Sequence, residues 1–193
     1  MQTNSPDESF PKPRFLKPLR EIQRVRLLAE IVVMVSLSGA LYLVKIFTLP
    51  EGGSVTLGSM VPIFVLALRR GPKIGILGGV VFGLIALLVD TSSGIQPIGP
   101  AQVFLDYPLA FGLLGFAGFF RKTPLLGVGV GILARFCSHF VSGVLFFATF
   151  APTGVSPYEY SAIYNGSFLL AEFAITALIM VGLVKLKALQ LYL

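Results

Sequence analysis

The sequence feature that most constrains this chain is a succession of long apolar runs separated by short polar segments. Only 12% of its 193 residues are charged, about half the share found in soluble domains. So few polar side chains cannot cover a water-soluble surface, whereas about 20 apolar residues cross a bilayer as one helix. We therefore predict an all-α, polytopic membrane protein: a basic cytoplasmic tail, residues 1–26, and a membrane domain of about six transmembrane helices, residues 27–193. The apolar runs cover residues 27–47, 57–68, 74–89, 100–120, 124–150 and 158–184.

The positions of the basic residues predict how the chain is oriented. Thirteen of the fifteen lysines and arginines lie in the tail or directly after the second, fourth and sixth runs. Cytoplasmic loops of membrane proteins are enriched in these two residues. We therefore predict that both termini are cytoplasmic. Because the basic residues mark the ends of apolar runs, they indicate membrane topology and not a nucleic-acid partner.

Two of the runs carry more specific signals. The second run, 57–68, would reach only about 18 Å as a helix. We expect it to be tilted, kinked at Pro62 or partly re-entrant. The third run, 74–89, is rich in glycine, which favours close packing between helices.

Four ionisable residues fall inside the runs, where each needs a partner or a function because burial in lipid is costly. Arg135 and Glu172 lie near the middle of the fifth and sixth runs. We predict that they form a structural ion pair between these two helices. The other two, Asp106 and His139, lie closer to the outer surface.

Polar side chains from three of the runs gather in the outer half of the membrane. With a helical rise of 1.5 Å per residue, their predicted depths lie between about 5 and 15 Å below the outer surface. Because three helices present hydrogen-bonding groups at similar depths, we predict a substrate-binding pocket there. The residues are Asp106, His139, Tyr160 and Asn165.

Helical spacing supports this prediction. His139, Gly143 and Phe147 follow one another at intervals of four residues and share one face. Gly143 would leave room beside the imidazole, and Phe147 would add an aromatic ring. Ser161 and Asn165 share a face in the same way. His139 and Asn165 would supply directional hydrogen bonds.

The side-chain chemistry favours a small cation with an aromatic part. Asp106 supplies negative charge, while Tyr107, Phe147 and Tyr160 supply ring faces for stacking and cation–π contact. Pro108 lacks an N–H group and is expected to bend the fourth helix at this point.

The residues alone leave simpler interpretations open. His139 could form only a helix–helix hydrogen bond. Asp106 could pair with Arg135, and any single aromatic side chain could belong to the interfacial belt.

The sequence carries no signature of an enzyme. It has neither a P-loop nor an H-E-x-x-H motif, and no serine stands at a legible spacing from a second catalytic group. We expect no metal and no cofactor. A membrane binding protein without an ATPase needs a partner to drive transport.

Four strings of the sequence carry a more specific signal: LRRGPKIG, LDYPLAF, ARFCSHFVSGVLFF and YSAIYNG. Together they resemble the thiamine-specific S components of energy-coupling factor (ECF) transporters over roughly residues 27–185. The resemblance implies a six-helix protein of the bacterial cell membrane that binds thiamine from outside. It also implies transport through a shared module of two cytoplasmic ATPases and one transmembrane coupling protein.

The resemblance also implies roles for individual residues. A small-x-x-x-small face on the first helix, here Ser36 and Ala40, would dock on the coupling protein. The family usually has Glu at position 106 and uses tryptophan for stacking, whereas this chain has no tryptophan and carries Phe147 at one of those positions. The alternatives are an S component for a thiamine precursor or another small vitamin, and a membrane scaffold without transport. The family's ligand-contacting positions fall on Asp106, Tyr107, His139, Gly143, Tyr160 and Asn165.

Overall fold

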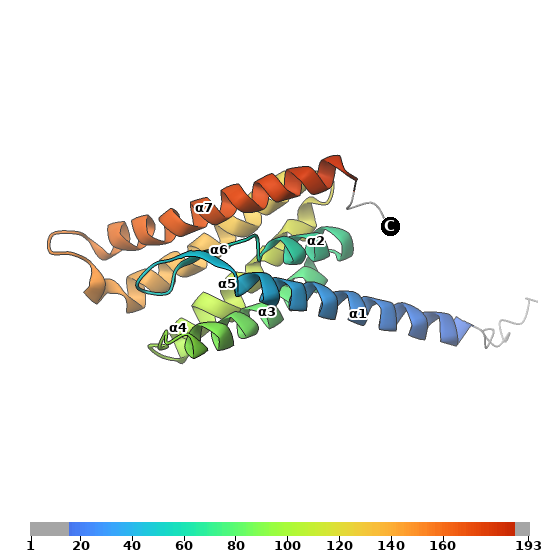
Figure 1. Ribbon diagram of the computed structural model, residues 1–193, viewed down its shortest axis with the longest axis horizontal. Helices are drawn as coiled ribbons and strands as arrows, with labels where there is room; N and C mark the ends of the chain where they lie inside the picture. Colours follow the sequence, from blue (N-terminus) through green and yellow to red (C-terminus); the bar gives the residue numbers. More distant parts are fainter. Residues whose placement is uncertain (1–15, 188–193) are drawn as a thin grey trace, which may run out of the picture.

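The computed structural model describes residues 16–187 and shows an elongated helical bundle (Figure 1). Five of its helices are long and apolar enough to cross a membrane. The predicted all-α, polytopic fold is thus confirmed, and a short helix, α2, adds a sixth element. The start of α1 and the end of α7 lie at the same end of the bundle (Figure 1). The elements are α1 Leu16–Tyr42, β1 Lys45–Thr48, β2 Ser54–Thr56, α2 Val61–Arg70, α3 Pro72–Ser92, α4 Pro100–Phe104, η1 Leu105–Leu109, α5 Ala110–Gly112, η2 Leu113–Phe120, α6 Pro124–Phe146, η3 Ala148–Phe150 and α7 Pro157–Lys185.

The predicted boundary between tail and membrane domain, after residue 26, falls inside a helix. The α1 helix runs unbroken from Leu16 to Tyr42, so the last part of the predicted tail is helical. Residues 1–15 of that tail lie outside the described residues.

Proline marks the start of most of the helices. A proline in the first turn costs little because the first N–H groups of a helix have no intrahelical partner. The sequence therefore sets these starting points locally. The prolines are Pro62 in α2, Pro72 in α3, Pro100 in α4, Pro124 in α6 and Pro157 in α7.

The second apolar run forms the short helix α2, which is not one of the five helices long enough to cross a membrane alone. Its ten residues reach about 15 Å. Pro62 lies in its first turn, so the predicted kink at this residue does not occur. Ile63, Phe64 and Leu66 are fully buried, because α2 packs inside the bundle against α1, α3 and the fourth span. A helix that is apolar on all sides belongs in such a position.

The glycines of α3 allow the fourth span to approach closely, as predicted. A side chain at Gly79 would overlap the carbonyl group of Phe111, and one at Gly83 would overlap that of Tyr107. This contact positions the fourth span, which begins at α4 and ends with η2. Inside it, η1 forms a wider π-helical turn around Pro108, whose missing N–H breaks the regular ladder.

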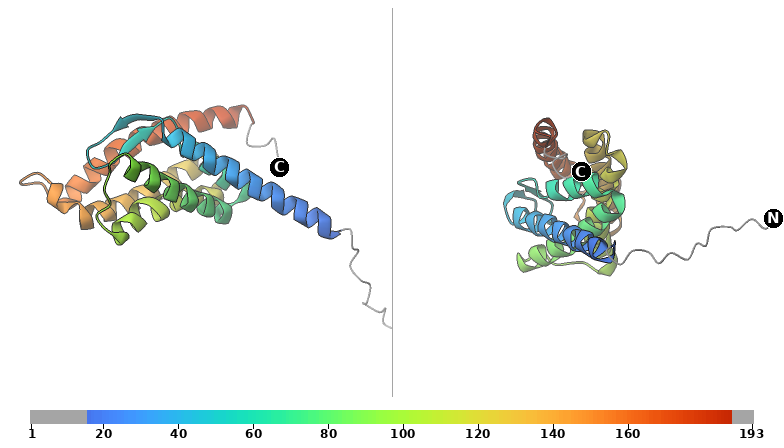
Figure 2. Two further views of the ribbon diagram at one scale, coloured as in Figure 1. Left: turned by 60° about the horizontal axis from the view of Figure 1, so that its bottom comes forward. Right: turned by 90° about the vertical axis from the view of Figure 1, so that its right-hand side faces the viewer.

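A β-hairpin that the sequence analysis did not predict follows α1. Strands β1 and β2 pair antiparallel, and the hairpin runs along α7 (Figures 1 and 2). The first apolar run was predicted to continue to residue 47, but its last residues form β1.

Basic residues from the end of α2 and from the segment after the fourth span meet at one end of the bundle. Arg69 and Arg70 both form salt bridges with Glu30 of α1. Arg121 donates hydrogen bonds to the carbonyl oxygens of Leu68 and Arg69. The loops after α2 and after the fourth span therefore lie on one side, as the predicted topology requires.

Candidate substrate-binding pocket

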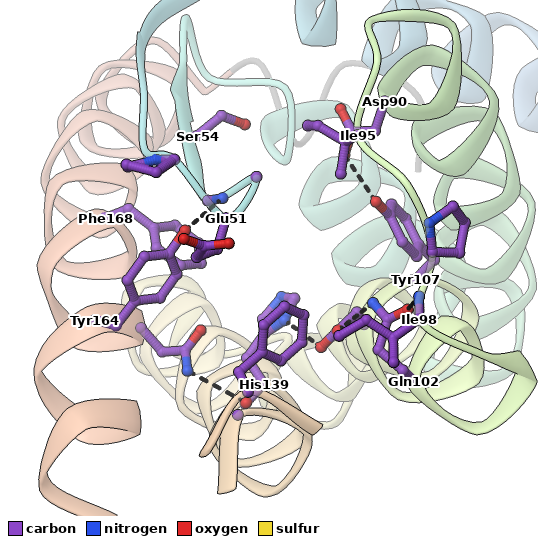
Figure 3. Close-up of a pocket in the computed structure, with 18 of the residues that line it drawn as sticks. Glu51, Ser54, Asp90, Ile95, Ile98, Gln102, Tyr107, His139, Tyr164 and Phe168 are labelled. Atoms are coloured by element: carbon purple, nitrogen blue, oxygen red, sulfur yellow. Dashed lines mark hydrogen bonds and ion pairs between the residues drawn. The ribbon is translucent and has the colours of Figure 1, made fainter. Parts of the chain in front are cut away.

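A cavity of about 480 Å³ opens at the end of the bundle opposite these basic loops. The hairpin tip, the loop 93–98 and the helices α3, α6 and α7 contribute to its wall, together with the fourth span (Figure 3). This volume is typical of pockets for small molecules. Among the described residues, no group of three or more His, Cys, Asp or Glu side chains could hold a metal ion.

All eight residues predicted to bind the substrate line this cavity. The side chains that the estimated helical phases and depths grouped together therefore do lie around one cavity, although they come from three spans. They are Asp106, Tyr107, His139, Gly143, Phe147, Tyr160, Ser161 and Asn165.

Asp106 lies in the π-helical turn and accepts three hydrogen bonds. Its Oδ1 lies 2.9 Å from Nδ1 of His139. Its Oδ2 accepts from Nε2 of Gln102 at 2.7 Å and from Oγ of Ser142 at 2.8 Å. The side chain is only 13% exposed, so these donors replace the water that the carboxylate loses.

The contacts of His139 determine which of its nitrogens carries the proton. Nε of Arg135 donates to Nε2 of His139 at 3.2 Å. Because a guanidinium has no acceptor, Nε2 must be the unprotonated nitrogen. Nδ1 then carries the proton and donates it to Asp106. His139 is therefore a neutral link between the positive Arg135 and the negative Asp106.

A second carboxylate, Asp90, lies at the end of α3 and was missed by the sequence analysis. It accepts hydrogen bonds from the hydroxyl groups of Tyr42 and Tyr107, at 2.9 and 3.1 Å. Lys45 of β1 forms a salt bridge with it at 2.7 Å. In the sequence, Asp90 directly follows the third apolar run, and Lys45 is one of the two basic residues that lie neither in the tail nor after the second, fourth or sixth run. Tyr107, predicted to stack on the ligand, holds Asp90 with its hydroxyl group.

Gly143 allows α7 to approach α6. A side chain at Gly143 would overlap the hydroxyl group of Ser161 and lie 3.1 Å from Nδ2 of Asn165. The space predicted to remain beside His139 is thus filled by α7. Nδ2 of Asn165 donates to the carbonyl oxygens of His139 and Ser161. Within residues 16–187 its Oδ1 accepts no hydrogen bond, which leaves it as an acceptor for a ligand.

An aromatic wall on α7 faces these carboxylates. Tyr160, Tyr164 and Phe168 follow at intervals of four residues, with ring centroids 5.9 and 6.1 Å apart. Phe147 and Phe150 add a further pair of rings at 5.9 Å. Tyr164 and Phe168 were not predicted, although their spacing from Tyr160 in the sequence was a readable signal.

The predicted ion pair between Arg135 and Glu172 is wrong. No nitrogen of Arg135 lies within 4.0 Å of a Glu172 oxygen. Instead, Nη1 of Arg135 donates to the sulfur of Met60 at 2.9 Å, and the guanidinium lies 4.1 Å from the centre of the Phe111 ring. Oε1 of Glu172 accepts from the backbone N–H and the hydroxyl group of Thr56. Arg135 therefore contacts His139 on its own helix together with Met60 and Phe111, whereas Glu172 binds Thr56 of β2.

The predicted docking residues lie away from the pocket. Ser36 and Ala40 are both exposed on the side of α1 that the bundle leaves uncovered. Val32, Val33 and Leu37 are exposed around them. This arrangement leaves the face open to lipid or to another membrane protein.

Comparison with known proteins identifies the family. The family model described as "Thiamine transporter protein (Thia_YuaJ)" matches residues 28–192. The thiamine transporter ThiT of Bacillus subtilis (strain 168) is 32% identical over 176 residues, which are 82% of this chain and 89% of that protein. A second relative with this name, from Lacticaseibacillus paracasei, is 32% identical over 149 residues, covering 69% of this chain and 74% of its own.

A solved structure supports the same family. The structure of ThiT from Listeria monocytogenes superposes with a TM-score of 0.73 at 26% identity, covering 86% of this chain and 97% of that one. With a family model that matches nearly its whole length, this chain belongs to the thiamine transporter protein family and is a multi-pass protein of the cell membrane.

Proposed function

We propose that this chain is the substrate-binding S component of a vitamin importer and that it binds thiamine in the pocket from the outer side of the membrane. Thiamine joins a positively charged thiazolium ring to an aminopyrimidine ring. The observation that carries the proposal is the meeting of carboxylates with an aromatic wall in one cavity. Such a site attracts a cation by charge and holds its rings by stacking and cation–π contact.

The charges of the pocket support a cationic ligand. Three carboxylates, Glu51, Asp90 and Asp106, line the cavity together with one guanidinium, Arg135. Lys45 compensates Asp90 from outside the cavity. The site retains an excess of negative charge, which a monocation such as thiamine would balance. Oδ1 of Asn165 is positioned to accept from the amino group of the pyrimidine.

Transport by this chain would depend on a separate module of two cytoplasmic ATPases and one transmembrane coupling protein. The sequence carries no P-loop with which to use ATP. The small residues Ser36 and Ala40 on the uncovered face of α1 would allow a helix of the coupling protein to approach closely.

Calorimetric titration of the purified protein in lipid nanodiscs tests the ligand. Thiamine, its separate pyrimidine and thiazole precursors, and an unrelated vitamin such as riboflavin form the panel. We expect thiamine to bind more tightly than either half, since only the whole molecule contacts both the carboxylates and the full aromatic wall. Preference for one precursor would support the alternative ligand, and absence of any binding would support a scaffold.

A further inference from the structure

Glu51 occupies a fixed turn at the tip of the β-hairpin. The N–H of Gly52 donates to the carbonyl oxygen of Leu49 at 3.1 Å, and the N–H of Leu49 donates to that of Gly53 at 2.6 Å. Gly52 has a φ of 94°, a left-handed conformation that glycine adopts without strain. The backbone that carries Glu51 is therefore held on both sides.

The hairpin tip is also fastened to the aromatic wall of α7. The N–H of Gly53 donates to the hydroxyl group of Tyr164 at 3.1 Å. A side chain at Gly53 would overlap the ring of Phe168, so the backbone of the tip packs directly on that ring. Figure 3 shows Glu51 beside Tyr164 and Phe168, across the pocket from Gln102 and Tyr107.

Glu51 differs from the other two pocket carboxylates in its partners. Asp90 pairs with Lys45, and Asp106 is held by three donors. The side chain of Glu51 accepts no hydrogen bond and forms no ion pair with any residue of the described range 16–187. It is half-buried and lines the cavity.

A partly buried carboxylate without a partner favours the arrival of a cation. It has given up part of its hydration, and the low polarity of the adjacent rings strengthens its attraction for positive charge. The neighbouring aromatic faces attract the same kind of ligand. Asp106 is less suited to this role, since its oxygens already accept three hydrogen bonds.

We propose that Glu51 contacts the positively charged ring of the ligand and supplies the charge that selects a cation over a neutral molecule of the same shape. This inference rests on the proposed function, because it assumes that thiamine occupies the pocket. Asp106 would then act mainly by holding His139 and the wall of the fourth span.

A comparison of two ligands and two matched variants tests this role. The ligands are thiamine and deazathiamine, in which a neutral ring of the same shape replaces the thiazolium. The variants are Glu51→Gln and, as the control, Glu159→Gln, an exposed residue in the first turn of α7 that does not line the pocket. Affinity is measured in nanodiscs, and thermal unfolding confirms that each variant is folded.

We expect Glu51→Gln to weaken thiamine binding by about tenfold, as the loss of one partly screened charge contact would. Binding of deazathiamine should stay within about twofold of the wild type, and Glu51→Asp should retain part of the thiamine affinity. Unchanged thiamine binding by Glu51→Gln, or an equal loss for both ligands, would overturn the inference. Failure of the wild type to bind thiamine would instead overturn the proposed function and this inference with it.

Discussion

Nδ1 of His139 lies 2.9 Å from Oδ1 of Asp106, and this contact joins α6 to the π-helical turn of the fourth span. Because Arg135 donates to the opposite nitrogen, the imidazole has a single usable tautomer. The two pocket residues thus act as one unit, with Arg135 behind them.

Asp106→Asn should break this unit although it preserves the shape of the side chain. Whichever way the amide is oriented, its NH₂ group would face donors: the His139 N–H on one side, or Gln102 and Ser142 on the other. We expect a loss of about 1.5–3 kcal/mol in thiamine binding, roughly 10- to 100-fold. Calorimetric titration measures it. Ser142→Ala removes only one donor and should lower the free energy of thiamine binding by less. Equal thiamine affinity of Asp106→Asn and the wild type would contradict the role of Asp106 in this unit.

Gly143→Ala should push α7 away from α6, since the new methyl group would overlap the Ser161 hydroxyl. Overpacking of this kind costs about 1–3 kcal/mol of unfolding free energy, and binding should weaken because Asn165 moves with α7. Thermal unfolding and titration measure the two effects. The matched control is Gly129→Ala on the same helix, where nothing lies within 4 Å of the added methyl group.

A second change sharpens the Gly143 prediction. Ser161→Gly removes the obstructing side chain, so the double variant should recover part of the lost stability. If Gly143→Ala unfolds at the same temperature as Gly129→Ala, the close approach of α6 and α7 is not what Gly143 provides.

Lys45 and Asp90 should show strong energetic coupling. Their side chains are 16% and 4% exposed, so removal of either one leaves a buried charge. We expect Lys45→Met and Asp90→Asn each to lower the unfolding free energy by about 3–5 kcal/mol. The double variant should lose clearly less than the two single losses combined, as a double-mutant cycle would measure. Strict additivity would mean that the pair contributes no direct interaction.

Exchanging Arg135 and Glu172 should not restore folding. An arginine at position 172 cannot accept the two hydrogen bonds that Thr56 donates there. A glutamate at position 135 cannot donate to His139 or Met60. We expect the swapped protein to be no better folded than the worse single variant, judged by the monodisperse fraction in size-exclusion chromatography. Recovery of folding by the swapped protein would indicate that Arg135 and Glu172 form a direct ion pair.

Ala40→Leu should separate binding from transport. Ala40 is exposed on α1 and lies outside the pocket, so thiamine affinity should stay within about twofold. If the coupling protein docks on this face, the larger side chain should abolish uptake in a reconstituted transport assay. Ala174→Leu, on an exposed position of α7, serves as the control. Normal uptake by Ala40→Leu would place the docking surface elsewhere.

Much of the pocket could be predicted because helix phase and depth are local properties. Gly143 and Phe147 follow His139 at the helical period, so their common face was readable before any fold was known. Tyr164 and Phe168 follow Tyr160 in the same way and could have been found by extending that pattern. The hairpin was missed because the residues of its first strand, apart from Lys45, continue the apolar composition of α1.

The partners of the charged residues could not be predicted. Lys45 and Asp90 are separated by 45 residues, and Thr56 and Glu172 by 116. Nothing in the local sequence distinguishes Glu172 bound to Thr56 from Glu172 bound to Arg135. Only the packing of the hairpin against α7 decides between them.

The sequence alone predicted the membrane class, the common side of both termini and the helix faces that line the pocket. Each depends on hydropathy, basic residues or periodicity within a short stretch of chain. The tertiary structure decided which charged side chains pair with one another and which pocket carboxylate remains available to a ligand. The partners of a buried charge depend on distances across the fold. Asp106 and Asp90 are therefore satisfied by the protein, whereas Glu51, at the tip of a hairpin that the sequence did not predict, faces the pocket without a partner among residues 16–187.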